Sequence, residues 1–335
     1  MGSDGTHLGH AAARAGLAGN PSDALGGAAL AVPVPGLWAE VELSDSDRVS
    51  VRGPAADEHW PSVTALVEHA DRYGHEGGDR LVTAAIVTLR RYARSGEVDI
   101  SDSPFEASWS SNIPRSVGLA GSSAVVVAAM RALSRRWGMD LSPATLAALA
   151  LAAERDELGV AAGWMDRATQ AHDTATLVET GVPIVLDGVT AVEMAPVVVA
   201  EPFELVVAWD VGGAAPSGRV HGRLRERLDA GDRLVVDAVA ALLDAARQAA
   251  AALRSGDRAA LADAMETTRG QRVALGALDP ATARLAEIAA TRGAVATSAG
   301  SGGAVSALPS EVDGAVEVVA EFERLGFDAI VVTVR

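Results

Sequence analysis

Hydrophobic and polar positions follow the two periods that distinguish strands from helices, and both kinds of segment interleave along the chain. Turn residues, mainly glycine and proline, separate the segments. Because strands and helices alternate in both halves, the pattern predicts an α/β or α+β fold rather than a helical bundle. Helices are expected at 60–73, 80–95, 122–137, 142–158, from about 220, and at 232–254, 259–274, 281–292 and 311–325. Strands are expected at 28–34, 37–43, 47–51, 98–100, 106–110, 177–187, 192–194, 204–209, 294–298 and 329–334.

Local signals refine this outline at a few places. Pro35-Gly36 between two apolar stretches predicts a hairpin turn, and Ser142-Pro143 predicts a capped helix start. Residues 1–10 lack the basic and apolar regions of a secretory signal and are expected to form a mobile tail. A new strand follows the segment 196–202, which predicts two domains, residues 1–196 and 197–335.

The composition narrows the classes of function. The 335 residues are 49% hydrophobic but only 4% aromatic, so the core is expected to consist of Ala, Val and Leu. A formal net charge of −16 argues against nucleic acid as a partner. No cysteine is present, which removes thiolate catalysis and cysteine metal sites. The longest apolar run, 144–153, is about half of a membrane span. The chain is therefore expected in the cytoplasm, without a membrane partner, as a monomer or homodimer.

A glycine- and serine-rich turn opens the expected helix 122–137; from Pro114 it reads Pro-Arg-Ser-Val-Gly-Leu-Ala-Gly-Ser-Ser-Ala. Glycines let backbone N–H groups close on an anion, and a helix N-terminus adds about half a positive charge. The turn therefore predicts a phosphate cradle, and a nucleotide as ligand. The competing interpretation is a simple turn and helix cap. The lysine-bearing P-loop is excluded, because the chain contains no lysine.

The same turn resembles the second signature of the GHMP small-molecule kinases, P-x-x-x-G-L-G-S-S-A, with the one-residue-longer loop of the glucuronokinase branch. Residues 14–23, Arg-Ala-Gly-Leu-Ala-Gly-Asn-Pro-Ser-Asp, are similar to the N-terminal substrate signature of that superfamily. Residues 298–304, Ser-Ala-Gly-Ser-Gly-Gly-Ala, are similar to its C-terminal glycine signature. Segments 162–167 and 217–221 look specifically like glucuronokinase. The resemblance covers residues 14–308 with the signatures in the expected order.

This resemblance implies an α+β fold of the GHMP kinase type. An N-terminal domain like domain 2 of ribosomal protein S5 would precede a C-terminal ferredoxin-like domain, with the active site between them. The cofactors would be ATP and Mg²⁺, and the partner a small-molecule sugar or sugar acid. Phosphoryl transfer to an alcohol needs an acceptor site, a metal, donors around the phosphates and often a carboxylate base.

The resemblance also assigns roles to individual residues. It implies Asp166 as the catalytic base with Arg14 beside it, and Ser123 and Glu154 as Mg²⁺ ligands. The nucleotide would contact Pro114, Gly118, Leu119, Ala120, Gly121, Ser122, Ser123 and Ala124. The acceptor would contact Arg14, Asn20, Ser22, Asp23, Asp166, Gly300, Ser301, Gly302 and Gly303.

Structural interpretations compete with several of these roles. A carboxylate interrupting an apolar helix, as Glu154 does, is also compatible with a solvated face or a buried ion pair with arginine. Asp166 is also compatible with a helix cap, and Asp23 with a turn in which its side chain bonds nearby N–H groups.

A uronic acid would bring a carboxylate that a guanidinium can bind with two parallel hydrogen bonds. Arg115, Arg167 and Arg219 are the candidates, and ordinary surface arginine is the alternative for each. His221 is equally compatible with a substrate contact and with an ordinary packed or exposed side chain.

One departure from the glucuronokinase pattern bears on the substrate. Those kinases carry Lys-Phe-Thr before the C-terminal glycines, where this chain carries Thr297-Ser298-Ala299. The departure is compatible with a different substrate or with reduced activity. The expected function is transfer of the γ-phosphoryl group of ATP to the anomeric hydroxyl of a hexuronic acid such as glucuronate. The alternatives are a kinase of another sugar, polyol or amino alcohol, and a catalytically weak sugar and nucleotide sensor.

Overall fold

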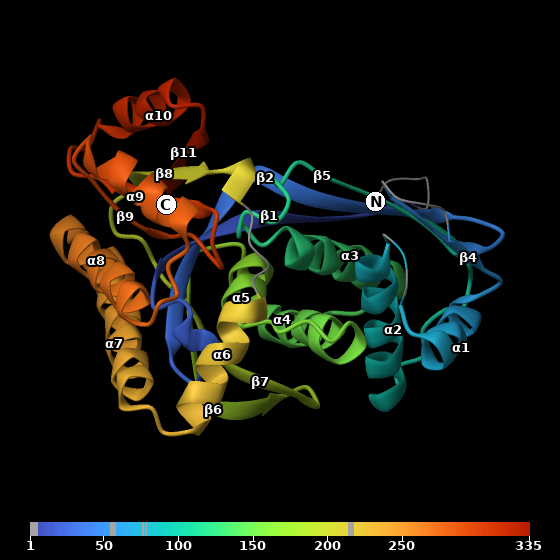
Figure 1. Ribbon diagram of the computed structural model, residues 1–335. Coiled ribbons are helices and arrows are strands. Elements are labelled where there is room, and N and C mark those ends of the chain that lie inside the picture. The colour runs from blue at the N-terminus through green and yellow to red at the C-terminus, as the bar shows by residue number, and fades with distance from the viewer. Residues whose placement is uncertain (1–5, 54–57, 76, 78, 214–217) are drawn as a thin grey trace.

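The computed structural model describes residues 6–53, 58–75, 77, 79–213 and 218–335, and the side chains of residues 58, 213 and 218–222 lie outside the description. Two sheets and their covering helices form the molecule (Figure 1). Strands are β1 His7–Ala18, β2 Ala28–Asp45, β3 Val49–Arg52, β4 Glu58–Trp60, β5 Phe105–Ser111, β6 Thr176–Leu186, β7 Val189–Pro196, β8 Phe203–Trp209, β9 Ala294–Ser298, β10 Ala304–Pro309 and β11 Asp328–Val334. Helices are α1 Val63–Tyr73, α2 Arg80–Ser95, α3 Gly121–Trp137, α4 Pro143–Ala152, α5 Met165–His172, α6 Gly218–Asp229, α7 Arg233–Ser255, α8 Arg258–Ala274, α9 Pro280–Ala290 and α10 Ala315–Arg324.

The first sheet is organised around the long strand β2. It has seven strands in the order β4-β3-β5-β2-β6-β7, and β1 pairs with β2 outside that path. The first half of β2 pairs with β6 and its second half with β5, while β1 pairs antiparallel along both halves. The turn between β1 and β2, residues 19–27, is thereby held at the end of two central strands, and it contains residues 19–23 of the expected substrate signature, whose first part lies in β1.

The hairpin expected at Pro35-Gly36 is wrong, because β2 runs through this point without reversing. Ala12 of β1 faces Trp38 and the next residue, Ala13, faces Val34. Residues 35–37 therefore form an irregularity in a continuous strand, which accommodates a proline that cannot donate to the ladder.

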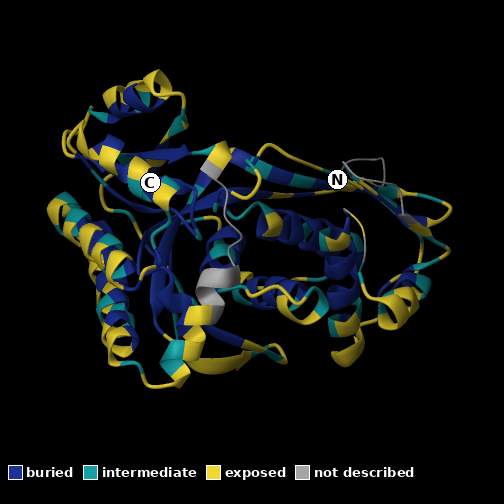
Figure 2. Ribbon diagram, viewed as in Figure 1, coloured by how far each residue is buried: buried dark blue, intermediate teal, exposed yellow. Residues whose placement is uncertain are grey.

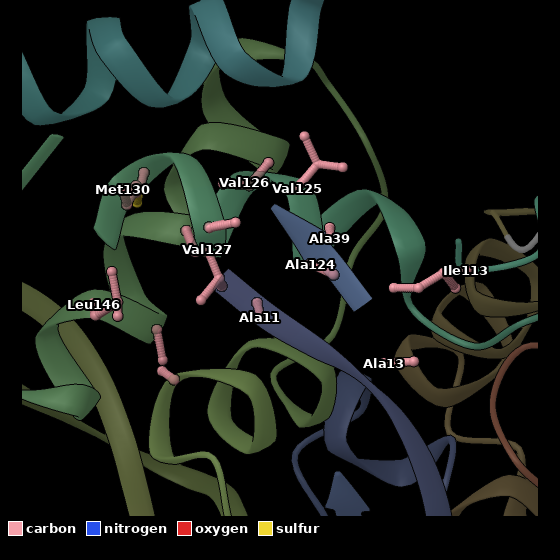
Figure 3. Packing of buried hydrophobic residues seen from close by; sticks show 14 of the residues in the cluster. Ala11, Ala13, Ala39, Ile113, Ala124, Val125, Val126, Val127, Met130 and Leu146 are labelled. Atoms are coloured by element: carbon pink, nitrogen blue, oxygen red, sulfur yellow. The ribbon is translucent and has the colours of Figure 1, made fainter. Parts of the chain in front are cut away.

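Small side chains let the helices approach the first sheet closely. Alanines of β1 and β2 lie against Ala124, Val127 and Met130 of α3 (Figure 3). The buried residues are mainly Ala, Val and Leu, which confirms the expected core composition. Both sheets carry buried residues, and exposed residues gather on outer helix faces and loop tips (Figure 2). Among the described helices, none has the length and apolarity needed to cross a membrane.

The second sheet has four antiparallel strands in the order β11-β8-β10-β9. In chain order this is 4-1-3-2, with α9 and α10 packed against the sheet, which is the ferredoxin-like arrangement that the resemblance implied. Ala299 and Ala304 of this half belong to the same buried cluster as Leu17 of β1. The two halves therefore share a continuous core beside the turn after β1.

Most of the expected elements are found within two or three residues of their expected bounds, and α2 matches its range. Residues 98–100 form no strand, and His7 to His10 belong to β1 rather than to a tail. The expected helix 142–158 ends as α4 at Ala152 and continues as a π-helical turn, Ala153–Glu157. Helix α5 and strand β10 were not expected.

Candidate functional site

A cavity of about 600 Å³ opens where the turn after β1, the start of α3, the π-helical turn and the start of α5 meet. Small-molecule sites commonly have volumes of about 300–1,000 Å³. Fourteen residues expected from the sequence line it: Arg14, Asn20, Asp23, Pro114, Arg115, Gly118, Leu119, Ala120, Gly121, Ser122, Glu154, Asp166, Arg167 and Ser301. Ser22, Ser123, Ala124, Gly300, Gly302 and Gly303 do not line it.

The loop before α3 has the backbone of an anion cradle. Ser116, Gly118 and Ala120 all adopt positive φ, at 62°, 78° and 63°. This conformation carries the chain into a 17-residue helix whose first N–H groups have no side-chain cap. Gly118 is required by close packing, because a Cβ there would lie 2.6 Å from the Gly302 carbonyl oxygen. The C-terminal glycine loop therefore packs directly against the cradle.

Arg14 links three distant segments at the centre of the site. Its Nη1 donates to the carbonyl oxygens of Gly118 at 2.7 Å and Ala299 at 2.8 Å. Its Nε donates to Asp166 Oδ1 at 2.7 Å. The arginine is 3% exposed, so these contacts fix the Asp166 carboxylate relative to the glycine loop. The side chain of Asp166 remains 22% exposed and faces the cavity.

Glu154 lies in the π-helical turn and is fully buried. Its Oε2 accepts from Arg167 Nε at 2.5 Å, and its Oε1 accepts from the Ser122 hydroxyl at 3.0 Å. Arg167 also donates to Asp166 Oδ2 at 3.2 Å. Burial alone lowers the pKa of Arg167, but the charges of Glu154 and Asp166 outweigh burial and raise that pKa above its ordinary value. Arg167 is therefore committed to the two carboxylates, and it is not free to bind a substrate carboxylate.

The pairing of Glu154 with a serine differs from the expected one. The Ser123 hydroxyl donates back to the Ala120 carbonyl at 3.1 Å, and Ser123 is fully buried outside the cavity lining. Ser122, by contrast, lines the cavity and contacts Glu154. Of the expected metal ligands, Glu154 lines the cavity but Ser123 does not, because α3 begins at Gly121 and its second residue, Ser122, contacts Glu154 instead.

The turn after β1 places Asp23 at the start of α5. Asp23 Oδ2 accepts from the backbone N–H groups of Trp164 at 2.9 Å and Met165 at 3.0 Å. Asp23 thus caps the helix that carries Asp166, while still lining the cavity. Ser22 is fully buried. Its hydroxyl group donates to the Ala28 carbonyl oxygen and accepts from the Ala28 backbone N–H. Ser22 therefore closes the turn and does not reach a ligand in the cavity.

The C-terminal glycine loop contributes mostly backbone. The Ala299 carbonyl accepts from Arg14 and from the backbone N–H of Gly16 at 2.7 Å. A Cβ at Gly300 would lie 2.1 Å from the Gly118 carbonyl oxygen. Of this loop, only Ser301 lines the cavity. Gly300, Gly302 and Gly303 therefore pack closely against neighbouring segments and do not line the cavity.

Several cavity residues were not expected from the sequence. One part of the wall is apolar, formed by Leu81, Trp109, Val125, Leu158 and Val160. Arg80 also lines the cavity, beside the expected candidate Arg115, and neither arginine forms an ion pair within the described residues. A second buried arginine, Arg272 of α8, donates to Asn20 Oδ1 at 3.1 Å. None of these residues forms a signature, and tertiary packing alone brings them together. Ser217 and the side chains of Arg219 and His221 lie outside the described residues.

Comparison with known proteins shows what this chain is similar to. Residues 80–174 match the GHMP kinases N terminal domain. The chain is 28% identical over 330 residues to probable glucuronokinase 2 of Arabidopsis thaliana, covering 92% of this chain and 86% of that protein. A Lin0012 protein from Listeria innocua has the same fold, with a TM-score of 0.81 at 17% identity over 98% of both chains. Phosphomevalonate kinase of Streptococcus pneumoniae, in complex with phosphomevalonate and AMPPNP, gives 0.78 at 16% identity over 98% of this chain and 99% of that one.

Proposed function

We propose that this chain, a GHMP-type phosphotransferase with an alcohol group as acceptor, transfers the γ-phosphoryl group of ATP to the anomeric hydroxyl of a hexuronic acid such as glucuronate. The observation that carries the proposal is the Asp166 carboxylate, which faces the cavity and is tied through Arg14 to the phosphate loop. A base candidate and an anion cradle are thereby held at a fixed separation, as in-line transfer to a hydroxyl requires.

The nucleotide half of the proposal uses the loop before α3 and the apolar wall. Backbone N–H groups at the start of α3 would receive the phosphates. Trp109, Leu81 and Val160 offer apolar surface for a base. Arg80 and Arg115 add positive charge to the same cavity in a chain whose net charge is −16. The chain shares its fold with a phosphomevalonate kinase solved with AMPPNP, which further supports ATP as the donor.

Ser122 and Glu154 are the residues that would hold Mg²⁺. Both line the cavity and offer the hard oxygen ligands that this ion prefers. Within the described residues, no group of three His, Cys, Asp or Glu side chains surrounds a potential metal position. Phosphate oxygens and water would therefore complete the ligands, as is usual for Mg²⁺. When bound, the ion neutralises the charge that develops on the phosphates.

Asp166 would accept the proton of the acceptor hydroxyl. Arg14 binds one of its oxygens and Arg167 the other, so the carboxylate is fixed in direction. Arg14 is also placed to stabilise charge near the transferred group, since its guanidinium bridges Asp166 and the Gly118 carbonyl.

A hexuronic acid is supported as acceptor by the similarity to glucuronokinases over most of the chain. The departure at Ala299 does not weaken this proposal, because residue 299 contacts the site through its carbonyl oxygen. Two of the arginines expected to bind a substrate carboxylate line the cavity, Arg115 and Arg167. Arg167 is paired with Glu154, so Arg115 is the one that remains available.

The decisive experiment is ADP release measured across glucuronate, galacturonate, neutral hexoses and polyols. We expect turnover with a hexuronic acid, and a fall in kcat of at least about 100-fold for Asp166→Asn, with ATP affinity retained. Turnover of neutral sugars but of no uronate would overturn the acceptor. Undiminished kcat in Asp166→Asn would overturn the role of the carboxylate, and ligand binding without turnover would indicate a sensor.

A further inference from the structure

Helix α8 supports the turn after β1 at two adjacent positions. The Thr268 hydroxyl oxygen accepts from the backbone N–H of Gly19 at 3.1 Å. Arg272, one helical turn further along α8, donates from Nη1 to Asn20 Oδ1 at 3.1 Å. Both side chains of α8 are 1% exposed. A helix more than 240 residues away in sequence therefore holds the beginning of the expected substrate turn.

The burial of Arg272 is energetically unfavourable. Its Nη2 donates to the Ala277 carbonyl at 2.9 Å, but its Nε has no hydrogen-bond partner within the described part of the chain. Burial lowers the pKa of Arg272 to about 10, although the charge of Asp279 opposes that effect. The guanidinium remains charged at neutral pH. A hydrophobic side chain would fill this position without the cost of desolvating a charge, so its contact with Asn20 calls for a functional explanation.

The contact fixes which way the Asn20 amide faces. A guanidinium can only donate hydrogen bonds, so the Asn20 carbonyl oxygen must face Arg272. The NH₂ group of Asn20 then points in the opposite sense, and no described residue accepts a hydrogen bond from it. Asn20 also lines the cavity, close to Asp23 and Arg14 in the sequence signature. The amide is therefore held as a hydrogen-bond donor toward a ligand.

We propose that Arg272 is a positioning residue of the acceptor site, which holds the Asn20 carboxamide so that its NH₂ group donates to an oxygen of the acceptor. In the hexuronic acid of the proposed function, on which the identity of the acceptor rests, this oxygen belongs to the carboxylate. Arg272 itself touches no ligand. Its effect on the acceptor passes through Asn20, while Thr268 fixes the backbone of the same turn.

A double-mutant cycle separates this role from a purely structural one. Arg272→Met, Asn20→Ala and the double variant are compared with the unchanged protein for kcat and for the KM of acceptor and ATP. We expect each single variant to raise the acceptor KM by about tenfold, with the ATP KM within about twofold. The double variant should be no worse than Asn20→Ala, because the effect of Arg272 requires the amide. Arg269→Met on the exposed side of α8 is the matched control, with unchanged kinetics.

Additive effects in the cycle, or equal rises in the KM of acceptor and ATP, would overturn the positioning role. If Arg272→Met does not fold, Arg272→Lys replaces it, since lysine keeps the charge but loses the planar fork of donors. The same cycle then applies, and a normal acceptor KM in Arg272→Lys would contradict the proposal.

Asn20→Asp tests the donor directly. Replacing NH₂ by a carboxylate oxygen should raise the KM of a uronate more than that of a neutral sugar, and an equal effect on both would remove the carboxylate from the inference. The cycle is scored on whichever acceptor the unchanged protein uses, or by calorimetric Kd of the sugar if none turns over. Failure of the hexuronic acid proposal is therefore distinguishable from failure of the role of Arg272.

Discussion

Arg14 shows at the scale of one residue how the site is assembled. Its guanidinium bonds to Gly118, Ala299 and Asp166, which come from three segments far apart in the chain. A buried arginine is stable when its N–H donors find acceptors, and here two backbone carbonyls and one carboxylate accept hydrogen bonds from three of its five N–H groups. The direction of the Asp166 carboxylate thus depends on the position of two loops, so a shift of either loop would disturb the reacting group.

Substitution of the two adjacent serines of the phosphate loop, Ser122 and Ser123, should have different effects. Ser122→Ala removes a hydroxyl that contacts Glu154 in the cavity, whereas Ser123→Ala removes one that bonds only to the Ala120 carbonyl. We expect Ser122→Ala to raise the Mg²⁺ concentration for half-maximal activity several-fold. Ser123→Ala should cost about 1 kcal/mol of stability at most and leave the Mg²⁺ dependence unchanged. Magnesium titration of the rate, together with urea unfolding, checks both, and the reverse pattern would restore Ser123 as the ligand.

The sequence resemblance identified this neighbourhood but not which serine lies beside Glu154. Ser122 and Ser123 are adjacent, and successive helix residues differ by about 100° around the axis. Because α3 begins at Gly121, Ser123 points back to the Ala120 carbonyl, and only Ser122 faces Glu154. The phase of a helix depends on its first residue, and that boundary is the least certain feature of a sequence pattern.

At the scale of elements, the sequence pattern predicted the helices whose bounds depend on their own residues. Helix α2 has a strong amphipathic pattern and was predicted with its actual bounds. Helix α5 has only eight residues, and its first N–H groups are capped by Asp23, 141 residues away in sequence. Because the capping residue is so far away in sequence, no residue near the start of α5 signals a helix. The π-helical turn was likewise invisible, because the residues of α4 continue smoothly into it.

Substitution of Gly163 should disturb the cap on α5. A Cβ at Gly163 would lie 2.4 Å from Asp23 Oδ2, so Gly163→Ala must displace the carboxylate or the start of the helix. We expect a fall in kcat of about tenfold or more, because Asp166 lies in the first turn of α5. Gly270→Ala is the matched control: it lies in α8 with nothing near its Cβ, and should stabilise by about 0.5–1 kcal/mol without altering kcat. Equal kinetics in both variants would contradict the cap's role.

At the scale of the whole molecule, the cavity is formed by segments from both ends of the chain. Strand β1 contributes Arg14, and the loop before β10 contributes Ser301 and the Ala299 carbonyl. The first sheet ends with β7 and the second begins with β8, which supports a proposed domain boundary after residue 196. Sequence periodicity predicted most elements of both sheets but not β1 or β10, and the close packing of Gly118 against Gly300 follows from tertiary structure alone.

Stability toward acid should depend on a carboxylate of helix α10, Glu321. Glu321 of α10 accepts from Arg324 at 2.5 Å and from Arg292 at 2.6 Å, and these hydrogen bonds lower its pKa from 4.5 to about 2. The folded protein therefore binds fewer protons at this group than the unfolded chain does. The stabilisation is complete above the ordinary pKa and is lost as pH falls through the folded one.

Comparison of the protein with Glu321→Gln measures this contribution. We expect the urea midpoint of the variant to be lower near pH 7, and the difference to shrink as the pH approaches about 3. A difference independent of pH would show that packing rather than charge sets the effect. The neighbouring arginines Arg292 and Arg324 remain charged throughout this pH range, so their charge does not contribute to the pH dependence.

The contact between Arg14 and the Ala299 carbonyl also sets an order of events during synthesis. A nascent chain can form its long β1–β2 ribbon and begin α3 early, but the guanidinium of Arg14 lacks one of its partners until residue 299 has left the ribosome. The competence to take up nucleotide should therefore arise only after the segment around residue 299 has emerged. A truncated product would carry the phosphate loop without the support that holds it in place.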